Sequence, residues 1–350
     1  MPATPDPDLT VRAAKETVEL YARAADQILA TVAARLRRGI DTPGWSEAKL
    51  LETAALRNEA QAVLDQLLAD TPDAVEAGMA RAYSQGAADA ARDLPDLQPV
   101  VARLTNERAV RALVDEAVTA LRGTHLQILR STLDVYRTAV YEAGTTSVVT
   151  GVRTRRQAAQ QVLDRFANRG VTGFVDRAGR AWDLASYSEM AVRTTAGRAQ
   201  VAGTLDRFTD AGRDLVIVSD APQECPACRP WEGRVLSITG ATPGYPTVGQ
   251  ATGSGLFHAN CRHALGAYIQ GVTRRFTNTA DPEGDQDRQE QRRLERGVRA
   301  WRRREAVALD DVAATRARAK QREWQARLRT HVDETGGKRL RYREQTTRAI

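Results

Sequence analysis

Five cysteine and histidine residues lie in two short segments whose spacing suits metal binding. The first segment reads Cys225-Pro226-Ala227-Cys228, and after a gap of 29 residues the second reads His258-Ala259-Asn260-Cys261-Arg262-His263. A C-x2-C turn places two sulfur atoms on one side of a tight bend, and a second knuckle can complete a tetrahedron around zinc. All three cysteines and half of the four histidines of the chain lie here. This clustering predicts a structural zinc site rather than a set of unrelated buried residues.

Five candidate ligands compete for four coordination positions. Cys225 and Cys228 form the safest pair, and Cys261 follows them. Either His258 or His263 can be the fourth ligand, while the other histidine hydrogen-bonds nearby. Zinc would also explain what holds the Gly/Pro-rich loop 221–255, because metal binding supplies folding free energy that such a loop does not obtain from burial.

A catalytic role for the same cluster is the alternative. A catalytic zinc keeps an open coordination position and usually has a carboxylate nearby as general base. Glu224 and Glu232 flank the first knuckle, but neither an H-E-x-x-H nor an H-x-E motif accompanies them. Two enzymatic interpretations remain. His258 could serve an HNH-type nuclease, and Cys261, which lies between two histidines, could be the nucleophile of a thiol protease. We nevertheless expect the cluster to be structural and the protein to have no enzymatic activity.

The C-terminal segment is rich in arginine. From Asp281 onward, 19 Lys and Arg stand against 13 Asp and Glu, and this surplus of six accounts for nearly all of the net charge of +7. On a helix these side chains form either a solvated face supported by Glu290 and Glu295, or a phosphate-contacting surface with Trp301 beside it. The candidate nucleic-acid contacts are Arg292, Arg293, Arg296, Arg299, Arg302, Arg303 and Arg304.

Helical patterns dominate the first half of the chain. Apolar residues recur at helical spacing over 11–40, and Ser46 is a plausible N-cap of a second helix that Thr71-Pro72 closes. Further helical patterns cover 73–93, 97–122 and 125–143. Thr154 and Gln157 have the spacing of a capping box that opens a helix to about Asn168.

The pattern changes after residue 170. Residues 173–182 have two short apolar arms around Gly179 and predict a hairpin. Ser186 and Glu189 suggest a capping box for a helix to about Ala211, and the β-branched run 215–218 predicts a buried strand, with a second strand at 234–238. The acidic run 281–285 suggests a hinge.

These elements predict a mainly α fold with a small α+β zinc-knuckle-like module. The expected organisation is a flexible tail (1–10), a helical region (11–170), the α+β module (171–273), a hinge (274–287) and an Arg-rich helical extension (288–350).

Composition excludes several classes of protein. With 350 residues, 42% hydrophobic and 27% charged, the chain is long enough for a sizeable core. Three cysteines rule out a disulfide framework. No apolar run approaches the roughly 18 residues of a membrane span, and the first ten residues lack the pattern of a signal peptide. We therefore expect a protein made in a cytoplasm, with no membrane partner.

Several of these features occur together in one known family. They are the helical run MAVRTT at 190–195, Asp220 before the Cys225–Cys228 pair, Trp231-Glu232-Gly233 after it, and the run LFHANCRH at 256–263. Over residues 172–271 the chain resembles the phage minor capsid protein 2 family, which is related to the Mu F-like head morphogenesis proteins. The chain departs from the pattern at Ala259, where the family usually has proline, and at His263, where many members have cysteine. Because histidine can bind a metal as cysteine does, the change at His263 preserves a possible ligand.

The resemblance implies a structural protein of the virion, in the head interior or at the portal vertex, that is present in the host cytoplasm during assembly. Its implied partners are the portal protein, capsid or scaffold proteins and the packaged phage DNA. A head-maturation enzyme, either protease or HNH-like nuclease, is the alternative. A host DNA-binding zinc protein is disfavoured because the basic excess is small.

Overall fold

The computed structural model describes most of the chain. The described residues are 8–94, 106–150, 153–169, 174–175, 179, 181–221, 223–259, 261–273 and 281–344. The chain divides into two compact units, and each is described by itself. Unit 1 contains Met1–Thr17, Thr71–Ala120 and Glu189–Arg288, and unit 2 contains Val18–Asp70, Leu121–Ser188 and Gln289–Ile350.

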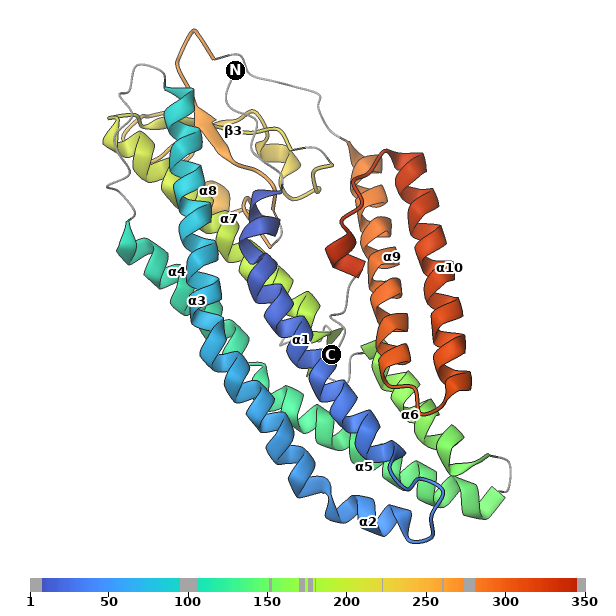
Figure 1. Ribbon diagram of the computed structural model, residues 1–350. Coiled ribbons are helices and arrows are strands. Elements are labelled where there is room, and N and C mark those ends of the chain that lie inside the picture. Colours follow the sequence, from blue (N-terminus) through green and yellow to red (C-terminus); the bar gives the residue numbers. More distant parts are fainter. Residues whose placement is uncertain are drawn as a thin grey trace. The chain divides into compact units, whose positions relative to one another are not determined.

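Helices make up most of the described chain, and Figure 1 labels them in chain order. They are α1 (Leu9–Arg37), α2 (Trp45–Leu51), α3 (Thr53–Asp93), α4 (Glu107–Arg122), α5 (His125–Thr150), α6 (Arg155–Arg169), α7 (Leu184–Asp210), α8 (Val248–Gly253), α9 (Pro282–Ala306) and α10 (Asp311–Thr335). Within the described residues, none of them combines the length and the apolar character needed to span a membrane. The predicted mainly α fold with a small α+β part is confirmed.

Two predicted boundaries differ from the helices of the structure. Pro72 does not end a helix but lies inside α3, because the buried side chains of Leu67 before it and Val75 after it continue the same apolar stripe. This packing outweighs the one backbone hydrogen bond that proline removes. The predicted tail 1–10 also overlaps α1, which begins at Leu9, whereas residues 1–7 lie outside the described part.

The predicted hinge 274–287 contains the first turn of α9. Asp281 caps this helix, since its Oδ1 accepts a hydrogen bond from the Gly284 amide at 2.9 Å, and Pro282 is the first helical residue. Proline is favoured at this position, and Glu283 and Asp285 suit the positive end of the helix dipole. Residues 274–280 lie outside the described part.

Local capping signals gave mixed results. The Thr154–Gln157 capping box is confirmed, with reciprocal hydrogen bonds of 2.9 and 3.2 Å. The box predicted for Ser186 and Glu189 was wrong, because α7 begins earlier and Asp183 accepts the hydrogen bond from the Ser186 amide at 3.0 Å. Helix α5 also extends beyond its predicted end, to Thr150.

Strands form two small antiparallel sheets. The predicted hairpin is confirmed where residues are described: β1 (Phe174–Val175) pairs with β2 (Ala181–Trp182), and Phe174 faces Trp182. Both strands belong to unit 2. In unit 1, β3 (Leu215–Val218), β4 (Val235–Ser237) and β5 (Leu265–Ala267) form a sheet in the order β4-β3-β5. The two strands predicted at 215–218 and 234–238 are therefore confirmed.

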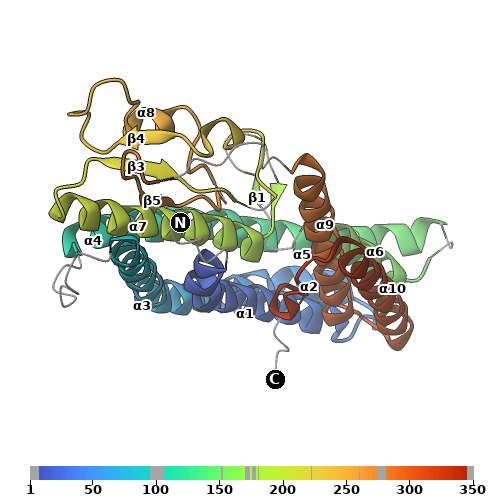
Figure 2. The same cartoon turned by 90° about the horizontal axis from the view of Figure 1, so that it is seen from above.

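The core of unit 1 lies between α7, this sheet and α8. Figure 2 shows α7 along one side of the sheet and α8 close to β4 on the other. Phe208 from α7, Val216 and Leu236 from the sheet and Ala251 from α8 are buried together, and Cys228 belongs to the same cluster. The first Cys/His knuckle is thus built onto a hydrophobic core.

Helices α3 and α7 approach each other closely within unit 1. A Cβ atom at Gly86 would lie 2.0 Å from the Gln200 carbonyl oxygen, and one at Gly203 would lie 2.1 Å from the Tyr83 carbonyl oxygen. The Thr204 hydroxyl donates to the Gly86 carbonyl at 3.1 Å across the same contact. Only glycine at these two positions permits this backbone spacing.

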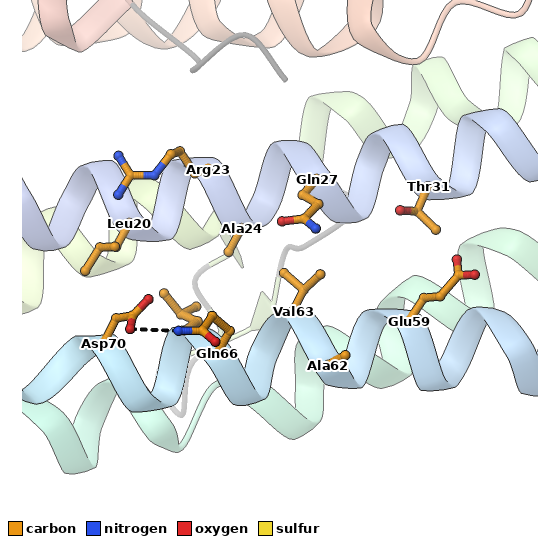
Figure 3. Close-up of a pocket in the computed structure, with 11 residues that line it drawn as sticks. Leu20, Arg23, Ala24, Gln27, Thr31, Glu59, Ala62, Val63, Gln66 and Asp70 are labelled. Atoms are coloured by element: carbon orange, nitrogen blue, oxygen red, sulfur yellow. Dashed lines mark hydrogen bonds between the residues drawn. The ribbon is translucent and has the colours of Figure 1, made fainter. Parts of the chain in front are cut away.

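Unit 2 has its own core, formed by α1, α2, α5 and α6. Trp45 is 2% exposed and its indole N–H donates to the Leu36 carbonyl at 3.2 Å. Figure 3 shows a separate groove between α1 and α3, with a volume of about 570 Å³. Its lining includes Leu20, Val63 and a Gln66–Asp70 hydrogen bond of 2.8 Å, but no cysteine or histidine. The groove therefore contains none of the candidate metal ligands.

Asp26 of α1 is a buried carboxyl in unit 2. It is 6% exposed, and within the described chain its Oδ2 has no hydrogen-bond partner. Burial raises the pKa of Asp26 to about 7, although Arg303 and Arg302 oppose this shift. The folded chain therefore holds a proton that the unfolded chain releases near pH 4.

Stability is expected to fall between pH 5 and pH 8 because of Asp26. In this range the folded state binds more protons than the unfolded state, so raising the pH favours unfolding. We expect Asp26→Asn to reduce this loss by roughly 2 to 3 kcal/mol, as judged by urea unfolding at pH 5 and pH 8. The control is Asp70→Asn, because Asp70 is a half-exposed carboxyl that lines the α1–α3 groove. An identical pH dependence in wild type and Asp26→Asn would contradict the prediction.

Candidate metal centre

The unit 1 sheet brings the two Cys/His knuckles together. The first knuckle follows β3 and the second precedes β5, and these strands are antiparallel neighbours in which Val218 pairs with Leu265. Beyond the strands, the Ser219 amide donates to the Ala264 carbonyl at 2.9 Å. The pairing therefore places both knuckles at the same end of the sheet.

The first knuckle is a tight hydrogen-bonded turn. The amides of Cys228 and Arg229 both donate to the Cys225 carbonyl, at 3.2 and 3.1 Å, and the chain continues into a 3-10 helix at Arg229–Trp231. The Glu224 side chain is fully buried beside the turn and accepts a hydrogen bond from Arg229 Nε at 2.6 Å. It also accepts from the Asp281 amide at 3.0 Å. Glu224 thus anchors the turn to the start of α9.

The second knuckle, residues 258–263, begins with a bend in the chain at His258. Phe257 has a positive φ of 58°, which turns the chain before His258. The Cys261 amide donates to the His258 carbonyl at 2.9 Å, and the His263 amide donates to Cys261 Sγ at 3.4 Å. Asn260 lies outside the described residues. These bonds direct Cys261 and His263 back toward the first knuckle.

All five candidate ligands line one small cavity of about 20 Å³. Cys225 Sγ lies 2.7 Å from His258 Nε2, Cys228 Sγ lies 3.5 Å from Cys261 Sγ, and Cys261 Sγ lies 3.4 Å from His263 Nδ1. The cavity has room for about one water-sized particle. Three sulfur atoms and imidazole nitrogens around such a space fit a structural zinc ion by size and by donor type.

The two histidines have different environments. The His263 side chain is 2% exposed, and its Nε2 lies 2.7 Å from Oε1 of Glu232, whose side chain is 6% exposed. His258 is partly exposed, and its Nδ1 contacts only the carbonyl of the adjacent Ala259, at 2.7 Å. A carboxylate or a backbone carbonyl behind the imidazole fixes the ring of a metal-binding histidine, so the two histidines differ mainly in burial.

Contacts inside the cluster shift the pKa values of Cys228, Cys261 and His263 in different directions. Contact with the Cys228 thiol, and then with His263, lowers the pKa of Cys261 despite its burial. Hydrogen bonding to Cys261, together with burial, raises the pKa of Cys228. Burial alone would lower the pKa of His263, but its contacts with Cys261 and Glu232 outweigh burial and raise it. Within this cluster the contacts therefore favour the thiolate at Cys261 and the thiol at Cys228.

Sequence reasoning missed two supports of this site. Glu232 was considered as a general base, but it holds His263 and accepts from the Ala221 amide at 3.2 Å. The loop 221–255 is also held by Asp214, whose carboxylate accepts from Ser237 Oγ at 2.7 Å and from Thr242 Oγ1 at 2.6 Å. Partial burial would raise the pKa of Asp214, yet hydrogen bonds to these hydroxyls and to Thr239 lower it well below its usual value.

Helix α8 is a further element within this loop that the sequence analysis did not predict. It begins with a capping box in which the Gln250 amide donates to Thr247 Oγ1 at 3.1 Å and Gln250 Oε1 accepts from the Thr247 amide at 2.8 Å. The Thr-x-x-Gln spacing was a usable signal in the sequence. The loop therefore does not depend on metal alone.

The C-terminal arginines do not share one environment. Arg299 and Arg303 are buried in unit 2. Arg299 donates to the Arg343 carbonyl at 2.6 Å, and Arg303 lies 3.8 Å from Asp183. Arg293 and Arg296 are exposed, whereas Arg292, Arg302 and Arg304 are half-buried. The structure thus separates two interior arginines from the five others of the predicted set.

Comparison with known proteins agrees with the resemblance seen in the sequence. The family model for phage minor capsid protein 2 matches residues 6–333. A structural protein of Lactococcus phage LL-H is 28% identical over 232 residues, which is 61% of this chain and 62% of that protein. The match thus spans less than two thirds of that relative's length, and no solved structure matches. Because the family model covers nearly all of the sequence, the chain belongs to the phage minor capsid protein 2 family.

Proposed function

We propose that this phage minor capsid protein acts as a structural component in procapsid assembly near the portal. Membership in the family carries this proposal. The proposed partners are the portal protein and capsid or scaffold proteins, and the proposed location in the virion is the head interior or the portal vertex. During assembly the protein would be in the host cytoplasm. Contact with packaged DNA is a further part of the proposal.

Within this protein, we infer that Cys225, Cys228, Cys261 and His263 hold one structural zinc ion. Ligand atoms lie within 4.8 Å of one another in two sets, Cys225, Cys228 and His258, and Cys228, Cys261 and His263. The burial of His263 beside Glu232 supports His263 over His258 as the fourth ligand. A zinc ion would cross-link the knuckle after β3 to the knuckle before β5. His258, whose Nε2 lies 2.7 Å from Cys225 Sγ, would cover the outer side of the cluster.

The geometry supports a structural role over an enzymatic one. A thiol protease needs an accessible thiolate with a base beside it, but Cys261 lies against Cys228 and His263 in a cavity too small for a peptide. A zinc hydrolase usually uses a nearby carboxylate as general base. Glu232 is occupied by His263, and Glu224 is occupied by Arg229 and Asp281.

The head location can be tested with a phage whose copy of this gene carries an early stop codon. Heads made with the protein supplied from a plasmid should contain it at far fewer copies than the major capsid protein, as measured by quantitative mass spectrometry of purified particles. Without the plasmid, infectious particles should fall at least tenfold. Normal yields of infectious particles without the protein, or its absence from heads assembled in its presence, would contradict the proposed function.

A further inference from the structure

A groove between α9 and α10 collects positive charge in unit 2. These two helices run side by side (Figure 1) and are packed through Leu294, Val298 and Leu328. The groove has a volume of about 600 Å³, within the range of ligand-binding clefts. Its charged lining consists of six cations and two acids: Arg293, Arg296, Arg303, Arg304, Lys320 and Arg327, with Asp183 and Glu323.

The two acids that line the groove are fewer than its six cations, and one of these cations, Arg293, is ion-paired with Glu290 outside the lining at 2.6 Å. Glu323 is shared by Lys320 at 2.7 Å and Arg327 at 2.8 Å. Asp183 lies on the buried side, near Arg303. Exposed Arg296 forms no ion pair within the described chain, and partial burial and Arg299 lower the pKa of its guanidinium, while Asp183 and Glu295 oppose this shift.

Positive charges also crowd around Arg304. Partial burial, followed by Arg316 and Arg303, lowers the pKa of its guanidinium, while Asp164 opposes the shift. Guanidinium groups remain charged at physiological pH regardless of such shifts. Gathering like charges in a cleft is unfavourable unless an anion offsets them, and such clefts focus an attractive field on polyanions.

The two tryptophans of the groove are not open stacking platforms. A Cβ at Gly297 would lie 2.1 Å from the Trp324 ring, so one face of that ring is packed against the α9 backbone. The guanidinium carbon of Arg293 lies 5.4 Å from the centre of the same ring. Arg304 covers Trp301 at 4.0 Å. The groove therefore offers cations rather than free aromatic faces, which favours a phosphate backbone over unstacked bases.

We propose that the groove between α9 and α10 binds the phosphodiester backbone of double-stranded DNA without sequence preference. This inference builds on the proposed contact with packaged DNA and assigns it to residues of two helices, including Lys320 and Arg327. From Arg293 to Arg304 the helix rises about 16 Å. That length matches roughly five base pairs of duplex at about 3.4 Å each.

The test compares two variants of the full chain that lose the same charge. The groove variant carries Arg296→Gln, Arg304→Gln, Lys320→Gln and Arg327→Gln. The control carries Arg38→Gln, Arg57→Gln, Arg108→Gln and Arg111→Gln, all exposed and outside the groove. Binding to a fluorescent 20-base-pair duplex is measured by anisotropy at several salt concentrations. A milder variant, Arg296→Gln with Lys320→Gln, changes only exposed side chains and guards against misfolding.

The groove variant should bind at least tenfold more weakly than wild type, and its log–log salt dependence should be shallower by about three to four. The mild variant should show an intermediate loss, and the control should stay within twofold of wild type. Equal losses in groove and control variants, no duplex binding by wild type, or equally tight binding of poly-glutamate would overturn the proposal. Because the assay uses purified protein, its failure is distinguishable from absence of the protein in heads.

Discussion

Replacing Cys225 and Cys228 with serine is expected to abolish metal binding and to release both knuckles from the unit 1 sheet. Structural zinc supplies on the order of 10 kcal/mol of binding free energy in small zinc domains, so we expect a loss of about 5 kcal/mol or more in local stability. Cys228 is also part of the buried cluster that contains Val216, Leu236 and Ala251. The double variant should therefore weaken the packing of the sheet as well as the cluster.

Hydrogen exchange followed by mass spectrometry can localise this effect. Peptides from 223–233 and 256–265 should exchange at least a hundredfold faster in the double variant, and a strong zinc chelator should produce the same pattern in wild type. Peptides from α5 and α6, which lie in unit 2, should change little. Ser254→Ala, an exposed substitution in the same loop, is the control. Unchanged protection of both knuckles after chelation would show that the hydrogen bonds around them suffice without metal.

Gly86→Ala or Gly203→Ala is expected to destabilise unit 1 by at least about 4 kcal/mol. Each new methyl group would lie about 2 Å from a backbone carbonyl oxygen of the facing helix, at Gln200 or Tyr83. Such a contact cannot be relieved by a side-chain rotation, so α3 and α7 would have to move apart, which places these changes among the most severe overpacking substitutions. The movement would also break the hydrogen bond from Thr204 to the Gly86 carbonyl.

The matched control for these glycines is Gly249→Ala. Gly249 is an exposed helical residue of α8, and its nearest atom to a new Cβ would be Thr247 Oγ1 at 3.8 Å. Alanine there should be neutral or slightly stabilising because it favours helix more than glycine does. Thermal unfolding followed by circular dichroism compares the three variants. Similar melting temperatures for Gly86→Ala and Gly249→Ala would contradict the close helix contact.

Features that a few neighbouring residues decide could be predicted from the sequence. The Thr154–Gln157 capping box, the β-branched strand at 215–218 and the C-x2-C turn depend on side chains within a few positions of one another. Boundaries that depend on distant packing were predicted poorly. Pro72 stays inside α3 because buried residues on both sides outweigh its missing N–H. The start of α9 was different, since Asp281-Pro282 carries a standard capping signal that was interpreted as a hinge.

The residues that line the cavity of the candidate site were predictable, but the residues that support them were not. Residue type and spacing identified all five donors that line the cavity. The partner of His263 is Glu232, 31 positions away, and Asp214 reaches hydroxyls up to 28 positions away. No local pattern encodes such pairings, because they arise only when β3, β4 and β5 assemble. Likewise, only the packing of unit 2 separates interior Arg299 and Arg303 from the other arginines.

The account depends most on a structural zinc ion held by three cysteines and His263. Elemental analysis by mass spectrometry of protein purified without added metal tests this directly, across wild type, His258→Ala, His263→Ala and the Cys225→Ser, Cys228→Ser variant. We predict about one zinc per chain in wild type and in His258→Ala, and less than a tenth of that in the other two. No zinc in wild type, or equal zinc in wild type and the double cysteine variant, would contradict the central claim. Retention in His263→Ala with loss in His258→Ala would reassign the fourth ligand.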